Sequence, residues 1–285
     1  AMLWPAPDGR LWLGAPGALF VLDTVAARAS VRLPLEADTV PEVVGAGGGR
    51  LFLRAGERLL AVDVQARRVV ARRDEGGAAE PLLDPCARWL YLGTRSGAVL
   101  GLATGSLAPR WSWARLGTPA AALAASPECD RVYLALGRRA RGQGGAPRLL
   151  TRDAQTGRVL AELGLPLPAA ALLTDSAGTL YGVLQDEADA TVAAWRPGPD
   201  GERLLWRRSA GSLGLRAPLR LRGDGRGGRL AVWQAGRGGR PGALVLLDAR
   251  NGQPLGHRPE GLLDAAFAAD GSLWILRADE LLRLP

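Results

Sequence analysis

The feature that most constrains the fold of this chain is a strand-like motif that recurs seven times. Each copy is a short turn followed by an apolar run, as in DGRLWL at 8–13 and CDRVYL at 129–134. The residues directly before the apolar runs are Arg10, Arg50, Arg88, Arg131, Thr179, Arg229 and Ser272. These positions are 38 to 50 residues apart. A regular period of this length indicates a propeller or another repeat array before any single motif is considered.

Each unit contains four short apolar runs in the same order. The motif is followed by a run that ends in a turn, such as LLTRDAQTG at 149–157, and then by a third run, such as RVLAEL at 158–163. Alternating apolar residues broken by Gly, Asp and Asn predict antiparallel strands joined by tight turns. An alanine-rich run precedes most motifs, as at 119–125 and 168–174. Small side chains and proline suit the innermost strand of a propeller blade, because blades crowd together near the axis.

The sequence therefore predicts a single all-β domain over residues 1–285, a seven-bladed β-propeller of four-stranded antiparallel blades. Residues 2–7 are expected to form the inner strand of the first blade. The last run of the chain reads as the third strand of the seventh blade. We therefore expect that this blade either lacks its outer strand or receives it from a continuation of the chain.

Two turns of the repeat carry a resemblance to a known group of proteins. DAQTG at 153–157 and DARNG at 248–252, with the G-x-L-[WY] strand starts, resemble the repeats of PQQ-like (quinoprotein-like) and YVTN-type β-propellers. The resemblance covers essentially the whole chain. It implies the fold far more than a function, because one fold hosts many unrelated functions.

The resemblance does not extend to the quinone site of these proteins. Quinoprotein enzymes of the superfamily place a tryptophan soon after the TG turn, where it docks the next blade, and an adjacent cysteine pair that can stack on the quinone. Here the segments after Gly157 and Gly252 contain no tryptophan, and Trp111 follows Gly105 at a longer spacing. The chain also has no adjacent cysteines. We therefore expect no tryptophan dock, no PQQ and no other cofactor.

The charge of the chain is basic and evenly distributed. All 36 basic residues are arginine, as a GC-rich genome would produce, and the formal net charge is +8. Such a charge permits an anionic partner. Because the arginines are spread through every repeat instead of forming one tail, a nucleic-acid partner is not expected.

The cysteine and histidine content excludes several kinds of chemistry. A single histidine, His257, leaves no histidine-based metal site and no Ser-His-Asp triad, and we expect no metal. Cys86 and Cys129 match no metal or redox spacing. Both lie two residues before the residue that precedes the apolar run, Arg88 or Arg131, in the turn between the first and second strands of successive blades. We expect these turns to be about 7–10 Å apart, at or beyond the disulfide limit, so reduced thiols are favoured and a disulfide stays the alternative.

Acidic residues recur at one position of the repeat, in the turn after the third strand. They are Asp23, Asp63, Asp153 and Asp248. An acidic ring is one interpretation. The favoured interpretation is that each side chain caps the backbone of its own turn, because Asp commonly accepts hydrogen bonds from the residues that follow it.

Charged residues on the predicted inner strands define a candidate site in the central funnel. The carboxylates are Glu42, Glu80, Asp84 and Asp264, and the guanidinium groups are Arg216, Arg220 and Arg222. Converging carboxylates would suit a hydrolase or lyase, usually with a metal. Ion pairs that rim a water-filled channel are the favoured interpretation, with Glu42, Asp84, Arg220, Arg222 and Asp264 as candidate funnel residues.

A second candidate site lies in the connections between the second and third strands of three successive blades. The segments 137–148 and 234–242 are rich in glycine and arginine, and 185–190 is acidic. Equivalent loops of a propeller emerge on one face, and loops on a rigid scaffold commonly carry recognition. The candidate binding residues are Arg138, Arg139, Arg141, Asp186, Glu187, Asp189, Arg237 and Arg240.

These features favour a non-enzymatic scaffold that binds another protein, as a subunit or assembly factor of a larger bacterial complex. The alternatives are a funnel-centred hydrolase or lyase, and a binder of an anionic ligand or membrane surface through the arginine-rich loops.

The apolar stretches are too short to span a bilayer, so peripheral membrane contact is the only membrane contact considered. We expect an extracytoplasmic protein, periplasmic or secreted, with a cytoplasmic one as the alternative. The chain begins without a recognisable signal peptide, which leaves open that one was removed.

Overall fold

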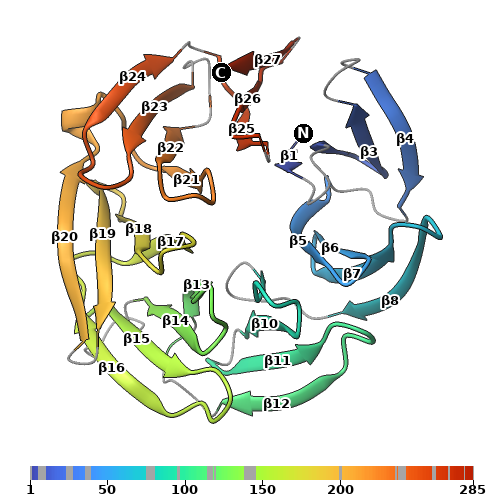
Figure 1. The fold of residues 1–285 in the computed structure, drawn as a ribbon, viewed down its shortest axis with the longest axis horizontal. Coiled ribbons are helices and arrows are strands. Elements are labelled where there is room, and N and C mark those ends of the chain that lie inside the picture. Colours follow the sequence, from blue (N-terminus) through green and yellow to red (C-terminus); the bar gives the residue numbers. More distant parts are fainter. Residues whose placement is uncertain are drawn as a thin grey trace.

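The fold was established from a computed structural model, in which seven small sheets stand around a central axis (Figure 1). The structure describes residues 2–5, 11–23, 28–35, 40–74, 81–94, 97–113, 118, 120–137, 146–198, 201–234, 236, 242–258, 261–268, 270–278 and 280–284. Within them the only helix is a short 3-10 turn, Gly211–Leu213. The predicted seven-bladed β-propeller is therefore confirmed.

The first four blades each contain four strands. Blade one is β1 (Met2–Pro5), β2 (Leu11–Ala15), β3 (Ala18–Asp23) and β4 (Arg28–Pro34). Blade two is β5 (Glu42–Gly47), β6 (Arg50–Ala55), β7 (Arg58–Asp63) and β8 (Arg68–Asp74). Blade three is β9 (Leu82–Leu83), β10 (Trp89–Gly93), β11 (Val99–Ala103) and β12 (Pro109–Trp113). Blade four is β13 (Ala120–Ala125), β14 (Arg131–Leu136), β15 (Arg148–Asp153) and β16 (Val159–Gly164).

The remaining blades complete the ring. Blade five is β17 (Ala169–Thr174), β18 (Leu180–Gln185), β19 (Ala190–Gly198) and β20 (Gly201–Ser209). Blade six is β21 (Arg220–Gly223), β22 (Arg229–Gln234), β23 (Ala243–Asp248) and β24 (Pro254–Arg258). Blade seven is β25 (Asp264–Phe267), β26 (Leu273–Leu276) and β27 (Leu281–Leu284). Among the described residues it has three strands where the other blades have four.

Every blade is an antiparallel meander whose strands follow chain order from the axis outward. The alanine-rich runs form the inner strands, as predicted, and each strand motif begins the second strand. His257 lies on β24, an outer strand, also as predicted.

The hydrophobic core is divided into seven clusters, one between each pair of neighbouring blades. Successive side chains of a strand point to opposite faces of its sheet, so each blade supplies two clusters. In β14, Val132 and Leu134 pack toward blade three, whereas Tyr133 and Ala135 pack toward blade five. The apolar residues of the motif are consecutive for this reason: both faces of every blade are buried.

Two tryptophans of outer strands dock against the next blade, which corrects the expectation of no tryptophan dock. Trp113 lies against Gly157 and Trp206 against Gly252, each at the glycine of the next blade's turn. These glycines have φ of 70° and 69°, and a Cβ atom would lie 2.2 Å from Trp113 Nε1 or 2.6 Å from the Trp206 ring. Only glycine satisfies both requirements. The dock was missed because Trp113 follows its TG turn at a longer spacing than expected and no TG turn precedes Trp206 in its blade.

Three arginines of the strand motif, in blades two, three and six, each link their blade to the next one. Arg50 donates to the carbonyl of Thr104 (3.1 Å), and Arg88 donates to that of Cys129 (2.7 Å). Arg229 donates to Gly271 in the same way. In each case the acceptor is a turn carbonyl of the following blade. The recurrence of arginine at this repeat position therefore has a structural cause.

The recurrent aspartates cap their own turns, as the favoured interpretation predicted. Asp63 accepts the Ala66 N–H (2.7 Å), Asp153 accepts that of Thr156 (2.7 Å), and Asp248 accepts that of Arg250 (2.8 Å). The hydrogen bonds from Thr156 hold the pKa of Asp153 below its usual value. The side chain of Asp23 lies outside the described residues.

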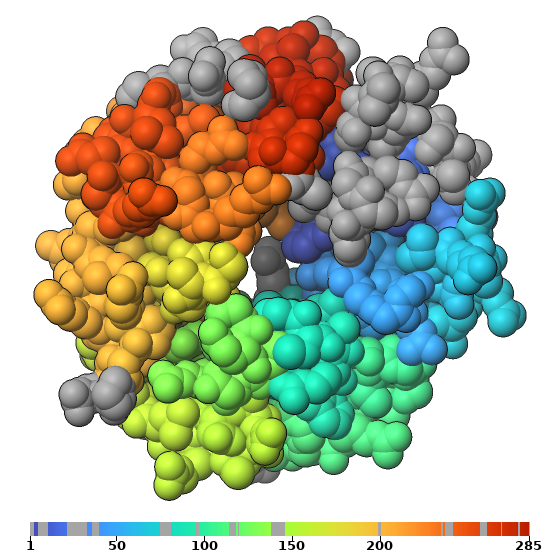
Figure 2. Space-filling view, in the orientation of Figure 1, coloured from blue at the N-terminus to red at the C-terminus, as the bar shows by residue number. Residues whose placement is uncertain are grey.

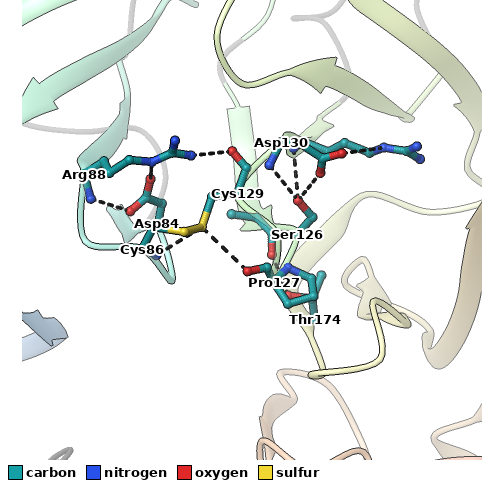
Figure 3. The surroundings of a disulfide bond; sticks show 10 residues. Asp84, Cys86, Arg88, Ser126, Pro127, Cys129, Asp130 and Thr174 are labelled. Atoms are coloured by element: carbon teal, nitrogen blue, oxygen red, sulfur yellow. Dashed lines mark hydrogen bonds and ion pairs between the residues drawn. A yellow bond between two sulfur atoms is a disulfide. The ribbon is translucent and has the colours of Figure 1, made fainter.

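Cys86 and Cys129 form a disulfide, so the favoured expectation of reduced thiols was wrong (Figure 3). Their Cα atoms are 6.3 Å apart, inside the limit for a bridge. The two cysteines lie in the turns between the first and second strands of blades three and four, as predicted. These turns approach more closely than expected, and the hydrogen bond from Arg88 to Cys129 joins them as well.

We predict that Trp206→Ala lowers the free energy of unfolding by about 3–5 kcal/mol, the usual cost of truncating a buried tryptophan. Trp206 is 8% exposed, and its Nε1 donates to the Ala249 carbonyl at 2.9 Å. Leu204→Ala is the control on the same strand, because Leu204 is 51% exposed. Denaturant unfolding measures both variants. Equal losses would contradict the docking role.

We predict no free thiol in denatured protein that has not been reduced, and two after reduction. Cys86→Ser with Cys129→Ser should lower the free energy of unfolding by about 2–4 kcal/mol, because the bridge constrains the unfolded chain. A thiol titration and denaturant unfolding measure these quantities. Two thiols before reduction would contradict the bridge.

Candidate functional site

The inner strands enclose a cavity of about 500 Å³ on the propeller axis, and all seven blades contribute to its wall. Figure 2 shows its opening at the centre of the disc. Single residues line it from blades one and seven, namely Trp4 and Asp264, and several from each of the other blades. The alanine-rich inner strands predicted from the sequence leave this space, because small side chains fill little of it.

A group of charged side chains lies where blades six, seven and one meet. Asp264 is completely buried, and its Oδ2 accepts the backbone N–H of Leu3 at 2.8 Å. Its Oδ1 lies 3.9 Å from Arg220 Nη1. The guanidinium of Arg222 lies over the Trp4 ring, 4.2 Å from the ring centre, in a cation–π contact. These contacts connect three blades in front of the short strand β25.

Burial raises the pKa of Asp264 above its ordinary value, because a desolvated carboxylate is penalised more than a carboxylic acid. Arg222, the Leu3 N–H and Arg220 all act in the opposite direction, since each stabilises the carboxylate.

The structure brings together four of the five candidate funnel residues. Glu42, Arg220, Arg222 and Asp264 all line the axial cavity. Asp84 is not among the lining residues, and Glu80 lies outside the described residues. Arg216 is exposed, and its backbone N–H donates to the side chain of Gln234 (2.7 Å).

Asp84 caps the turn between β9 and β10. It accepts the Arg88 N–H at 2.7 Å, and its other oxygen lies 3.6 Å from Arg88 Nε. Burial raises the pKa of Asp84, against the hydrogen bonds and charge from Arg88 and Trp89 that lower it. The residue directly after the inner strand has this capping role in three further blades. These residues are Ser126, Asp175 and Asp224. The recurrence was visible in the sequence and was the missed signal.

The acidic connection of blade five is a tight turn closed by its own aspartate. Asp186 Oδ1 accepts the N–H groups of Ala188 (2.9 Å) and Asp189 (3.0 Å), and Asp189 accepts that of Ala190 (2.7 Å). Glu187 is exposed. Asp186 and Glu187 border a second, shallower cavity, which also takes alanine and proline residues from blades four, five and six.

The predicted arginines of the neighbouring loops lie outside the described residues. They are Arg138, Arg139, Arg141, Arg237 and Arg240. The strands that flank them are described: β14 ends at Leu136 and β15 begins at Arg148, and β22 ends at Gln234 before β23 begins at Ala243. Because all blades share one strand order, the strand ends on either side of these segments lie on the same face as the acidic turn.

Within the described residues, no group of three or more His, Cys, Asp or Glu side chains is arranged to hold a metal ion. Across the same residues, no helix has the length and apolar character that crossing a membrane requires.

The fold and the axial cavity define this protein as a seven-bladed β-propeller. No family profile matches the sequence, and no curated protein is detectably similar to it. Solved structures with the same fold include BamB from Moraxella catarrhalis, with 20% identity and a TM-score of 0.61 over 99% of this chain and 80% of that one. The β-propeller domain of Cps50 (Swd1) from Myceliophthora thermophila has 10% identity and a TM-score of 0.75, over 98% and 93%. Hydrazine synthase from Kuenenia stuttgartiensis has 13% identity and a TM-score of 0.75, over 99% and 94%. At these identities the similarity establishes the fold alone.

We predict a pH-dependent effect of Asp264→Asn, which keeps an oxygen to accept the Leu3 N–H. Because the folded state raises the pKa of Asp264, it binds this proton more tightly than the unfolded chain does. The stability that this tighter proton binding adds to the folded state is fully present below the ordinary pKa of Asp, near 4. It is lost as the pH rises through the pKa of Asp264 in the folded state. The variant should therefore gain stability relative to the parent protein as the pH rises from about 4.

Denaturant unfolding at several pH values measures this difference. Asp270→Asn is the matched control on the same blade, because hydrogen bonds from Ser272 lower the pKa of Asp270. Its stabilising contribution is present above the ordinary pKa and is lost as the pH falls, so the control should show the opposite slope. The same slope in both variants would contradict the assignment for Asp264.

Proposed function

We propose that this protein is a non-enzymatic scaffold that binds a partner protein, as a subunit or assembly factor of a larger bacterial complex. The observation that carries the proposal is the shallow cavity bordered by Asp186 and Glu187, at the meeting point of blades four, five and six. Its alanine and proline lining offers apolar contact area, and the charged turn provides a polar rim. Protein interfaces commonly combine an apolar centre with such a rim.

The strand ends that flank the two arginine-rich segments lie on the same side of the propeller as this cavity. Five arginines in them outnumber the three carboxylates of Asp186, Glu187 and Asp189. Two of these carboxylates already accept backbone hydrogen bonds in their own turn. The partner therefore presents an acidic surface, which forked guanidinium donors recognise well.

The proposed location is extracytoplasmic. The support for it is the disulfide between Cys86 and Cys129, because structural disulfides are rare in proteins that remain in the cytosol.

A photo-crosslinking amino acid at Glu187 tests the proposed face. We expect one dominant protein adduct in an extract of the native host, and none from the same amino acid at Arg207, which is exposed on the outer strand β20. The captured protein is then purified for direct binding measurements. Equal labelling from both positions would contradict a specific binding face.

Replacing Arg138, Arg139, Arg141, Arg237 and Arg240 by serine should weaken binding of that purified partner roughly tenfold at low salt, since each rim charge contributes a few tenths of a kcal/mol. The salt dependence of the affinity should decrease as well, because exposed charges act through a screened field. The melting temperature should change little.

A charge-matched control replaces five exposed arginines of the outer strands and turns, Arg68, Arg110, Arg203, Arg207 and Arg250. This variant should bind as the parent protein does. If both variants lose affinity equally, the effect is one of net charge and the proposed face is wrong.

A further inference from the structure

The axial cavity has a charged part and an apolar part in its wall. Blades six, seven and one contribute Arg220, Arg222, Asp264 and Trp4. Blades three and four face them across the ring, and blade five lies beside blade six (Figure 1). Most residues that line the cavity from blades three, four and five are alanine, leucine or proline, and the others are Thr174, Asp175, Tyr181 and Gln185. The apolar ones include Leu82, Leu83, Ala121, Ala171, Leu172 and Leu173. A cavity divided in this way suits a ligand with one charged end and one apolar end.

Arg220 is the group best placed to hold the charged end. Its side chain is 44% exposed, and its one ion-pair partner within the described chain is Asp264, at 3.9 Å. That separation exceeds hydrogen-bond length, and the described residues provide no hydrogen-bond acceptor for this guanidinium. An arginine in this state offers forked N–H donors to an incoming oxyanion.

Asp264 lies beside Arg220 without a hydrogen bond to it. One of its oxygens accepts the Leu3 N–H, and the other, Oδ1, is buried without a hydrogen-bond partner among the described residues. Two guanidinium groups therefore accompany one buried carboxylate. The second of them, Arg222, is oriented by its stacking on Trp4.

The other charged residues of the cavity have partners of their own. Asp224 accepts the Arg229 N–H and pairs with the guanidinium of the same residue. Asp175 accepts the Tyr181 hydroxyl at 2.8 Å and two turn N–H groups. Glu42 is engaged in an interaction as well. Arg220 is therefore the group in the cavity with N–H donors available for a ligand.

The apolar part of the wall is unusually accessible for leucine side chains. Leu172 and Leu173 on β17, and Leu82 and Leu83 on β9, are only half-buried although they line an internal cavity. The volume of about 500 Å³ lies within the range of pockets that bind small molecules. Leucine surface left in such a cavity gains burial when an apolar group replaces water.

We propose that the axial cavity binds a small monocarboxylate with an apolar tail, whose carboxylate is held by Arg220 and whose tail packs on Leu172 and Leu173. This function goes beyond the scaffold role and does not depend on it, because Arg220, Leu172 and Leu173 do not border the shallow cavity of the proposed binding face.

Decanoate is the probe that tests the proposal, below its micelle concentration and with purified protein. Calorimetry measures its affinity, and the fluorescence of the tryptophans reports the contact with Trp4. Decan-1-ol and decyltrimethylammonium have the same tail without the negative charge. We expect both to bind at least about tenfold more weakly than decanoate, because the carboxylate contact is lost. No detectable decanoate binding, or equal binding of the three probes, would overturn the proposal.

Two variants locate the site. Arg220→Gln should weaken decanoate binding at least about tenfold and leave the weak binding of decan-1-ol unchanged, whereas Arg207→Gln on the outer strand should change neither.

Ala170→Phe should block both probes, because Ala170 is exposed on the cavity wall and the larger side chain fills space there. The substitution leaves the charges of the cavity unchanged. Decanoate binding that survives Ala170→Phe would place the ligand outside the cavity and overturn the proposal. If Arg220→Gln does not fold, Ala170→Phe and the uncharged probe decide the question. Arg220→Gln should bind the partner protein as the parent protein does, because Arg220 lines the axial cavity and not the shallower one, whereas Ala170 lines both.

Discussion

Asp264 of blade seven accepts the backbone N–H of Leu3 in blade one, and this 2.8 Å hydrogen bond joins residues 261 positions apart. Around it, Leu3 and Leu11 pack with Ala266 and Trp274 in the seventh interblade cluster. Arg222 reaches from blade six to Trp4 in front of the same junction. Blade seven has three strands among the described residues, so the inner strands carry much of the ring closure. The axial cavity exists because this closure holds.

The basic composition of the chain has a structural explanation in part. Arg50, Arg88 and Arg229 occupy one repeat position and donate to turn carbonyls of the next blade. Each contact satisfies an acceptor between two blades that share no backbone pairing. Arginine serves this purpose better than lysine because its long planar group presents several donors. The net charge of +8 is therefore weak evidence for nucleic-acid binding.

Much of the fold was predictable because each repeat carries the residue types that its strands and turns require. Two apolar faces on every blade require consecutive apolar residues, and the tight turns between strands require glycine and aspartate. The caps at Asp63, Asp153 and Asp248 followed from the turn chemistry alone. The disulfide did not, because it depends on how closely two turns of neighbouring blades approach. Trp113 and Trp206 were missed because neither follows a TG turn at the expected spacing, and each docks against a glycine more than 40 residues further along the chain.

The sequence by itself determined the number of blades, the order of the strands within each blade and the place of the alanine-rich strands at the axis. All of these follow from local patterns, whose period and turn residues are read within one repeat. Only the tertiary structure decided which charged residues share the cavity and which serve turns. Asp84 and Asp264 are both carboxylates close to an inner strand in the sequence. Asp84 follows its strand and caps a turn, whereas Asp264 begins its strand and meets Leu3 and Arg220 from the two neighbouring blades. That difference arises when the ring closes, because closure brings side chains from opposite ends of the chain into contact.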